Sequence, residues 1–125
     1  GQNPHMTICP SFDFMADVLR QTLHKLLDEE AVAPERIVIL SPYRHTNSQS
    51  TWAEGLKDVD LHTEMNVMVK GKIRIGTIQS FKGLESDVVI LAGLTKQSLT
   101  QGELLYVATS RAKAALYIFS LSALS

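Results

Sequence analysis

The sequence predicts an α/β fold, a mostly parallel sheet with helices on both faces. Four short apolar runs, over residues 36–41, 72–78, 86–93 and 115–121, are typical of strands buried on both sides. Segments with helical periodicity lie between them, which favours right-handed strand–helix–strand crossovers. The length of 125 residues is that of a single domain.

The first expected element is a long amphipathic helix. Residues 1–6 are polar, patternless and end in His5-Met6, a dipeptide left by a common cloning site, so we take 1–6 as a cloning remnant and 7–125 as the domain. Ser11 can cap a helix from about residue 12 to about residue 30, and Pro34 ends any continuation. The apolar stripe of this helix consists of Met15, Val18, Leu19, Leu23, Leu26 and Leu27.

The middle and end of the chain supply the other elements. A strand over 36–41 precedes a polar loop, and the spacing of Thr51 and Glu54 predicts a short helix in which Trp52 fits the core better than a ligand site. Part of 62–69 is consistent with an extra strand. Strands over 72–78 and 86–93 follow, then a helix from 100 to about 112, and a final strand over 115–121.

Composition excludes several classes of protein. Apolar runs are too short to span a bilayer, and no basic-then-apolar leader opens the chain. The single cysteine and the four scattered histidines predict neither a disulfide nor a metal site, so a cytoplasmic protein is expected. The net charge is -1, but residues 67–125 carry 7 basic and 3 acidic groups, a bias that fits either an anionic partner or a solvated face.

In a parallel sheet, ligands gather at the loops that follow the strands, here 41–47, 79–85 and 91–97. No phosphate-binding GxxxxGK[ST] loop is present: Gly71 and Gly76 have its spacing, but the lysine is missing. No strand ends in paired acids that could hold magnesium. The chain alone therefore lacks the groups for phosphoryl transfer.

Two segments are hard to ascribe to packing: Thr77-Ile78-Gln79-Ser80-Phe81-Lys82-Gly83-Leu84-Glu85, and Leu104-Leu105-Tyr106-Val107-Ala108-Thr109-Ser110-Arg111-Ala112. With their flanks, TIQSFKGLESDVVIL resembles motif V and LLYVATSRAKAALYIF resembles motif VI of the superfamily 1 helicases of the UvrD, Rep and PcrA type. Tyr43, Arg44 and Asn47 are similar to motif IVa, with one extra residue between arginine and asparagine. The order of elements resembles the second RecA-like motor domain (2A) without its large 2B insertion, and the compact spacing also resembles RecD-like and nuclease-associated members.

The resemblance implies roles for individual residues. Arg111 is the arginine finger that reaches the ATP γ-phosphate, and Gly83 and Glu85 lie near the nucleotide. Lys82 is either a phosphate contact or a surface lysine, and Phe81 either packs in the core, which we favour, or stacks on a base. From the residues alone, Gly83 reads as a turn with positive φ and Glu85 as a solvated strand start. The positions that match DNA contacts are Arg44, Asn47, Thr77, Gln79, Ser80 and Lys82.

The implied cofactors and partners belong to a longer protein. ATP and Mg²⁺ are expected in the full-length protein, with none bound by ligands from this chain alone. Single-stranded or partly duplex DNA and an N-terminal RecA-like domain are the expected partners, because motifs I, Ia, II and III and the motif IV arginine have no counterpart here. The isolated chain is expected to be inactive.

The predicted function is therefore that of the second motor domain of an ATP-dependent DNA helicase or translocase. Two alternatives stay open. One is a nucleic-acid-binding module that never turns over ATP, and the other is a doubly wound protein-interaction domain whose motif residues merely pack.

Overall fold

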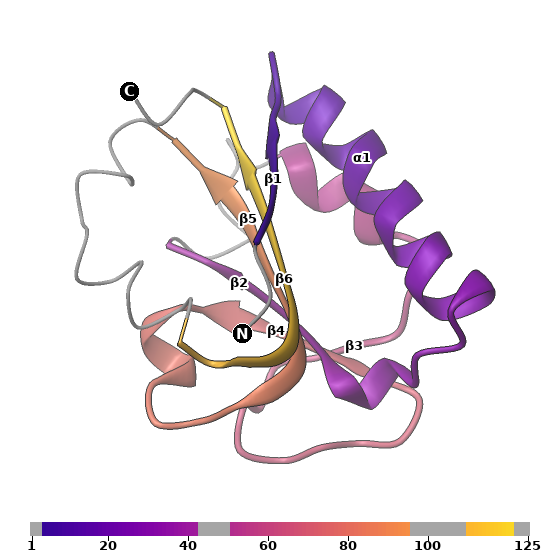
Figure 1. Cartoon of the computed structure of the whole chain (residues 1–125), viewed down its shortest axis with the longest axis vertical. Helices are drawn as coiled ribbons and strands as arrows, with labels where there is room; N and C mark the ends of the chain where they lie inside the picture. Colours follow the sequence, from indigo (N-terminus) through magenta and orange to yellow (C-terminus); the bar gives the residue numbers. More distant parts are fainter. Residues whose placement is uncertain (1–3, 43–50, 96–109, 122–125) are drawn as a thin grey trace.

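The fold is built on a six-stranded sheet in the order β1-β6-β5-β2-β4-β3 (Figure 1). We analysed a computed structural model, which describes residues 4–42, 51–95 and 110–121. All five strand pairs are parallel, which confirms the predicted α/β fold. The strands are β1 (His5–Ile8), β2 (Ile37–Ser41), β3 (Leu61–His62), β4 (Ile73–Thr77), β5 (Ser86–Leu94) and β6 (Ala112–Ser120).

The long amphipathic helix is present where the pattern predicts it. α1 (Phe12–His24) continues into a π-helical turn, η1 (Lys25–Glu29), so the helical segment spans the predicted residues. Ser11 is the N-cap, and its hydroxyl accepts a hydrogen bond from the Phe14 amide at 3.1 Å. The buried residues of this segment are Met15, Ala16, Leu19, Leu23 and Leu26.

We expect Ser11→Ala to lower the free energy of unfolding by about 1 kcal/mol, because the Phe14 amide loses its acceptor. Urea unfolding followed by far-UV circular dichroism measures the change. Thr22→Ala is a suitable control. The Thr22 hydroxyl donates to the Val18 carbonyl, which already accepts a backbone hydrogen bond within α1, so its loss leaves no backbone group without a partner. Equal losses in both variants would contradict the capping role.

The core on the α1 side of the sheet includes Trp52, from the short 3-10 helix η3 (Thr51–Leu56). Trp52 is 1% exposed, which confirms that it belongs to the core. Gly93, with φ +74°, lies against its indole: a Cβ there would come within 2.6 Å of Trp52 Nε1. The indole is therefore enclosed in the core on the α1 side of the sheet, against β5.

The opposite face of the sheet has its own apolar layer. Side chains of β2, β5 and β6 contribute to it, and Met65, Ile78 and Phe81 cover it from loops. The helix predicted from 100 to about 112 falls mostly outside the described residues. Its predicted end is wrong, because Ser110 and Arg111 form a turn and β6 begins at Ala112.

Two short strands differ from the sequence prediction. β1 pairs with β6 and includes His5 and Met6, which lie in the segment assigned to a cloning remnant. The His5 ring stacks on Tyr117 at 4.7 Å between centroids. β3 (Leu61–His62) overlaps the segment expected to hold an extra strand, residues 62–69, only at His62. Among the described residues, no helix is long and apolar enough to cross a membrane.

Candidate nucleotide and nucleic-acid site

The β4–β5 loop (residues 78–85) joins two parallel strands and carries most of the predicted site residues. It opens with a 3-10 turn, η4 (Gln79–Phe81), whose geometry is fixed by the residues around it. The Ser80 amide donates to Thr77 Oγ1 at 3.1 Å, and the Ser80 hydroxyl donates to the Thr77 carbonyl at 2.6 Å. Thr77 and Ser80 thus bond to each other at the end of β4.

Apolar side chains anchor this loop on the sheet. Phe81 is 1% exposed and Ile78 is equally buried, whereas Gln79 and Lys82 are exposed. The expectation that Phe81 packs in the core is confirmed. Because the Phe81 ring is covered, it offers no free face for a base to stack on.

The second half of the loop turns toward β5 at Gly83. Gly83 has φ +85°, while a Cβ placed there would meet no atom within 4 Å. Glycine is therefore favoured by the left-handed backbone and not by lack of space, as expected for a turn. The Leu84 amide closes the turn by donating to the Phe81 carbonyl at 3.0 Å.

Around the start of β5, the structure brings together the residues predicted for the nucleotide. The Ser86 amide donates to the Arg111 carbonyl at 3.0 Å, so Arg111 lies beside the residue that follows Glu85. Gly83 lies two residues before Glu85 on the same loop. Arg111, distant in the sequence, is thus brought next to the end of the loop that contains Gly83 and Glu85, at the N-terminal edge of the sheet.

Arg111 is half-buried in the turn that precedes β6. Its Nε is buried and has no hydrogen-bond partner among the described residues, and none of their ion pairs involves its side chain. The hydrogen bond from the Ser86 amide holds the backbone of Arg111, while the Nε–H of its guanidinium has no acceptor among the described residues.

Glu85 is exposed and has a loose ion pair with Lys113 of β6, with 3.9 Å between Glu85 Oε2 and Lys113 Nζ. Both side chains are more than half exposed, so the pair contributes little to stability. The carboxylate can therefore exchange this contact for a ligand. The expectation of a solvated strand start is confirmed for Glu85.

Three of the residues predicted to contact DNA lie at the other end of the loop. The Ile78 amide donates to the Ser41 carbonyl at 3.0 Å, so the loop begins beside the end of β2. Of the DNA set, Arg44 and Asn47 lie outside the described residues; Thr77, Gln79 and Ser80 lie at the C-terminal end of β4. Lys82 is on the middle of the loop.

The expected placement of the 79–85 segment therefore needs a correction. We expected the whole segment at the C-terminal edge of the sheet, where Ser41 and Leu94 end their strands. Because β4 and β5 are parallel, their connection must cross to the N-terminal edge, where β5 starts. Thr77, Gln79 and Ser80 consequently lie at one end of the β4–β5 loop, and Glu85 lies at its other end, next to the residue that bonds the Arg111 carbonyl.

Sequence reasoning missed Arg74, a charged residue of β4 that is only 4% exposed. Burial lowers the pKa of its guanidinium from the ordinary value. The signal that could have found it is a single arginine inside the apolar strand pattern of residues 73–77.

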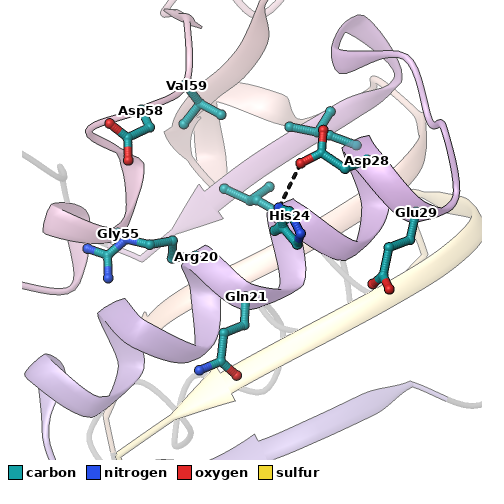
Figure 2. A pocket seen from close by; sticks show the side chains of 10 residues that line it. Arg20, Gln21, His24, Asp28, Glu29, Gly55, Asp58 and Val59 are labelled. Carbon is teal, nitrogen blue, oxygen red and sulfur yellow. Dashed lines mark ion pairs between the residues drawn. The ribbon is translucent and has the colours of Figure 1, made fainter.

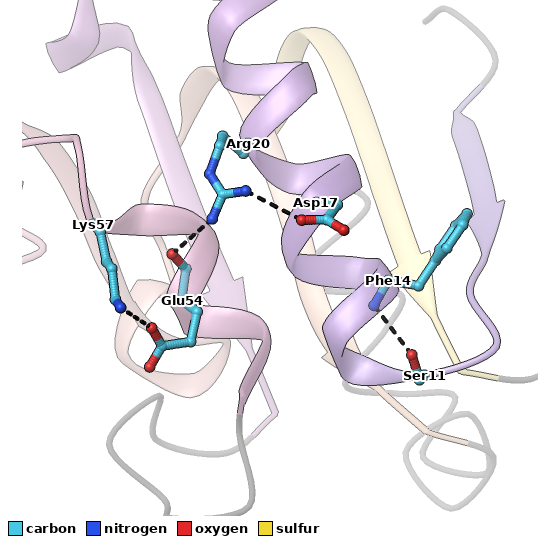
Figure 3. A network of polar contacts seen from close by, with 6 residues as sticks. All are labelled: Ser11, Phe14, Asp17, Arg20, Glu54 and Lys57. Atoms are coloured by element: carbon cyan, nitrogen blue, oxygen red, sulfur yellow. Dashed lines mark hydrogen bonds and ion pairs between the residues drawn. The ribbon is translucent and has the colours of Figure 1, made fainter.

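A separate groove of about 640 Å³ lies between α1 with η1 and the segment that follows η3 (Figure 2). Its polar lining includes His24 and Asp28, which pair at 2.7 Å. Nearby, Arg20 joins α1 to η3 by bonds to Asp17 and to the Glu54 carbonyl (Figure 3). None of the predicted site residues lines this groove. Within the described residues, no group of three or more histidine, cysteine or acidic side chains could hold a metal.

Comparison with known proteins finds a family match over the part of the chain that carries the motifs. Residues 72–119 match the family model of the UvrD-like helicase C-terminal domain, a range that contains both the β4–β5 loop and Arg111. No curated protein matches the chain. A solved structure, the C-terminal domain of a possible DNA helicase from Lactobacillus plantarum WCFS1, is similar over the whole chain and 78% of its own length, with 24% identity and a TM-score of 0.74.

Proposed function

We propose, from the premise that this chain holds a UvrD-like helicase C-terminal domain, that it acts as the second motor domain of an ATP-dependent DNA helicase or translocase. In this proposal it supplies the arginine finger and part of the single-stranded DNA site. The observation that carries the proposal is the hydrogen bond between the Ser86 amide and the Arg111 carbonyl, which brings Arg111 next to the loop that contains Gly83 and Glu85.

The chemistry of Arg111 suits a transferring phosphoryl group. A guanidinium is always charged and presents N–H donors in a planar fork, which stabilises negative charge on equatorial phosphate oxygens. The held backbone of Arg111 reduces the entropy lost when its side chain engages a ligand. Gly83 and Glu85 would face the same nucleotide from the loop.

The nucleotide would be shared with another domain. Since the described residues offer no acidic cluster, we expect Mg²⁺ to be held by the ATP phosphates and by an N-terminal motor domain. Bound there, ATP with Mg²⁺ supplies the phosphoryl group and neutralises part of its charge. The residues of this chain would bind and orient the nucleotide from the side opposite to the N-terminal motor domain.

The β4–β5 loop would couple ATP hydrolysis to DNA movement. Its Gln79 end carries exposed polar groups for DNA, and its Glu85 end adjoins Arg111. Because Ile78 and Phe81 are buried, displacement of one end is transmitted through a packed segment to the other. Arg44, Asn47, Thr77, Ser80 and Lys82 would complete the DNA contacts.

Gln79→Ala in the full-length protein is expected to raise the DNA concentration that half-saturates ATPase stimulation by about tenfold. One hydrogen bond to a charged group contributes about 1.5 kcal/mol, which corresponds to that factor. Steady-state ATPase assays with an oligonucleotide titration give the value. Gln21→Ala, which removes an exposed amide of α1, is the matched control and should leave half-saturation unchanged. If the two variants behave alike, Gln79 does not contact DNA.

The two alternatives, a nucleic-acid-binding module and a protein-interaction domain, differ from the motor domain in what they predict for the sequence upstream of this chain. A GxxxxGK[ST] strand–loop–helix segment about one domain upstream of this chain supports the motor. Its absence from the full-length sequence would favour a domain that does not turn over ATP.

A further inference from the structure

Arg74 is a buried cation that forms no ion pair within the part of the chain that the structure describes. It is the second residue of β4 and is only 4% exposed. An apolar side chain of similar volume would satisfy the packing at lower cost, because removing a charge from water is unfavourable. The position therefore calls for an explanation beyond filling the core.

The contacts of Arg74 join two loops. Its Nη1 donates to the Met65 carbonyl at 2.8 Å, and its guanidinium carbon lies 5.3 Å from the centroid of the Phe81 ring. The Nε atom is buried and has no hydrogen-bond partner among the described residues. Met65 precedes β4 in the sequence, and Phe81 belongs to the β4–β5 loop that follows it. The Arg74 side chain therefore contacts both the segment before its strand and the segment after it.

Gly76, two residues further along β4, faces the same side as Arg74. A Cβ at Gly76 would overlap the Met65 side chain and come within 2.9 Å of Ser80 Oγ. Met65 and Ser80 therefore sit directly on the strand backbone at this point. Arg74 and Gly76 together form the surface against which the first half of the β4–β5 loop is packed.

We propose that Arg74 is a positioning residue for the β4–β5 loop: through Phe81 and the Met65 carbonyl it fixes the turn that presents Gln79 and Ser80. The role of those two residues in DNA binding rests on the proposed function, whereas the effect of Arg74 on the loop does not. A planar guanidinium suits this position because it stacks on a ring and donates a directed hydrogen bond with the same group.

Hydrogen exchange in the 125-residue chain tests the positioning directly. In Arg74→Met, which keeps an unbranched apolar stem of similar size, we expect the amides of Ser80, Phe81 and Lys82 to exchange at least about tenfold faster than in the wild type. These amides bond to acceptors within the turn at 3.1 to 3.2 Å. The β5 amides should keep their wild-type rates.

Two further variants make the result specific. Arg20→Met removes an exposed arginine of α1 and should change none of these rates. Phe81→Leu keeps an apolar anchor but removes the ring, and it should accelerate the same three amides; it also replaces Arg74→Met if that variant does not fold. Unchanged exchange at residues 80–82 in the folded variants, or a uniform acceleration that includes β5, would overturn the proposal.

A functional readout distinguishes positioning from stability. In the full-length protein, Arg74→Met should raise the DNA concentration for half-maximal ATPase by at least about fivefold, with kcat at saturating DNA within about twofold of wild type. Arg111→Ala is measured in parallel. If Arg111→Ala abolishes turnover and Arg74→Met leaves half-saturation unchanged, the inference about Arg74 fails alone; if Arg111→Ala has no effect, the proposed function fails.

Discussion

Replacement of Arg111 by alanine in the full-length protein is expected to lower DNA-stimulated ATP hydrolysis by at least about 10³-fold, the scale of an arginine finger. The guanidinium stabilises charge that develops on the transferring phosphoryl group, so the loss falls on kcat. Arg111→Lys should restore little activity, because an ammonium lacks the planar fork. Steady-state ATPase assays at saturating DNA measure the effect.

The control for this variant is Arg20→Ala, which removes an arginine that pairs with Asp17 on α1 (Figure 3). Its turnover should equal that of the wild type. Activity of Arg111→Ala within about threefold of wild type would contradict the assignment of the finger. Circular dichroism shows that both variants are folded before the rates are compared.

Trp52→Ala is expected to destabilise the chain by about 3–5 kcal/mol, the range found when a large aromatic side chain is removed from a core. The indole is 1% exposed and lies against Gly93, whose backbone cannot move in to fill the space without disturbing β5. Guanidinium unfolding followed by far-UV circular dichroism gives the free energy, since the substitution removes the tryptophan fluorescence.

Phe14→Ala provides the comparison for Trp52. Phe14 is also aromatic and lies on α1, but it is 45% exposed, so its loss should cost less than about 1 kcal/mol. Similar losses in the two variants would show that Trp52 is not a principal core residue.

Much of the fold could be predicted because its signals are local. The strand at 37–41 is a continuous apolar run buried at every position, and the Ser11 cap and the spacing of Met15, Leu19 and Leu23 define α1. β1 could not be predicted, since it is four residues long and its partner, β6, lies more than a hundred residues away. Its pairing depends on a tertiary contact that no local pattern encodes.

The sequence proposes residues for the candidate site but does not give their arrangement. The motif resemblance identifies Gly83, Glu85 and Arg111, and the structure places them around one strand start. Their position at the N-terminal edge follows from the parallel direction of β4 and β5, which both pair with β2, and only the three-dimensional topology fixes this arrangement. Arg74 escaped prediction because a lone arginine in a strand usually faces solvent.

The most direct test of the central claim compares two ligands on the full-length protein bound to single-stranded DNA. ADP with aluminium fluoride mimics the transferring phosphoryl group, whereas ADP alone lacks it. Arg111→Ala should weaken binding of the mimic by about 10³-fold and leave the affinity for ADP within about threefold of wild type. Unchanged binding of the mimic, or equal weakening of both ligands, would contradict the claim that Arg111 acts on the phosphoryl group.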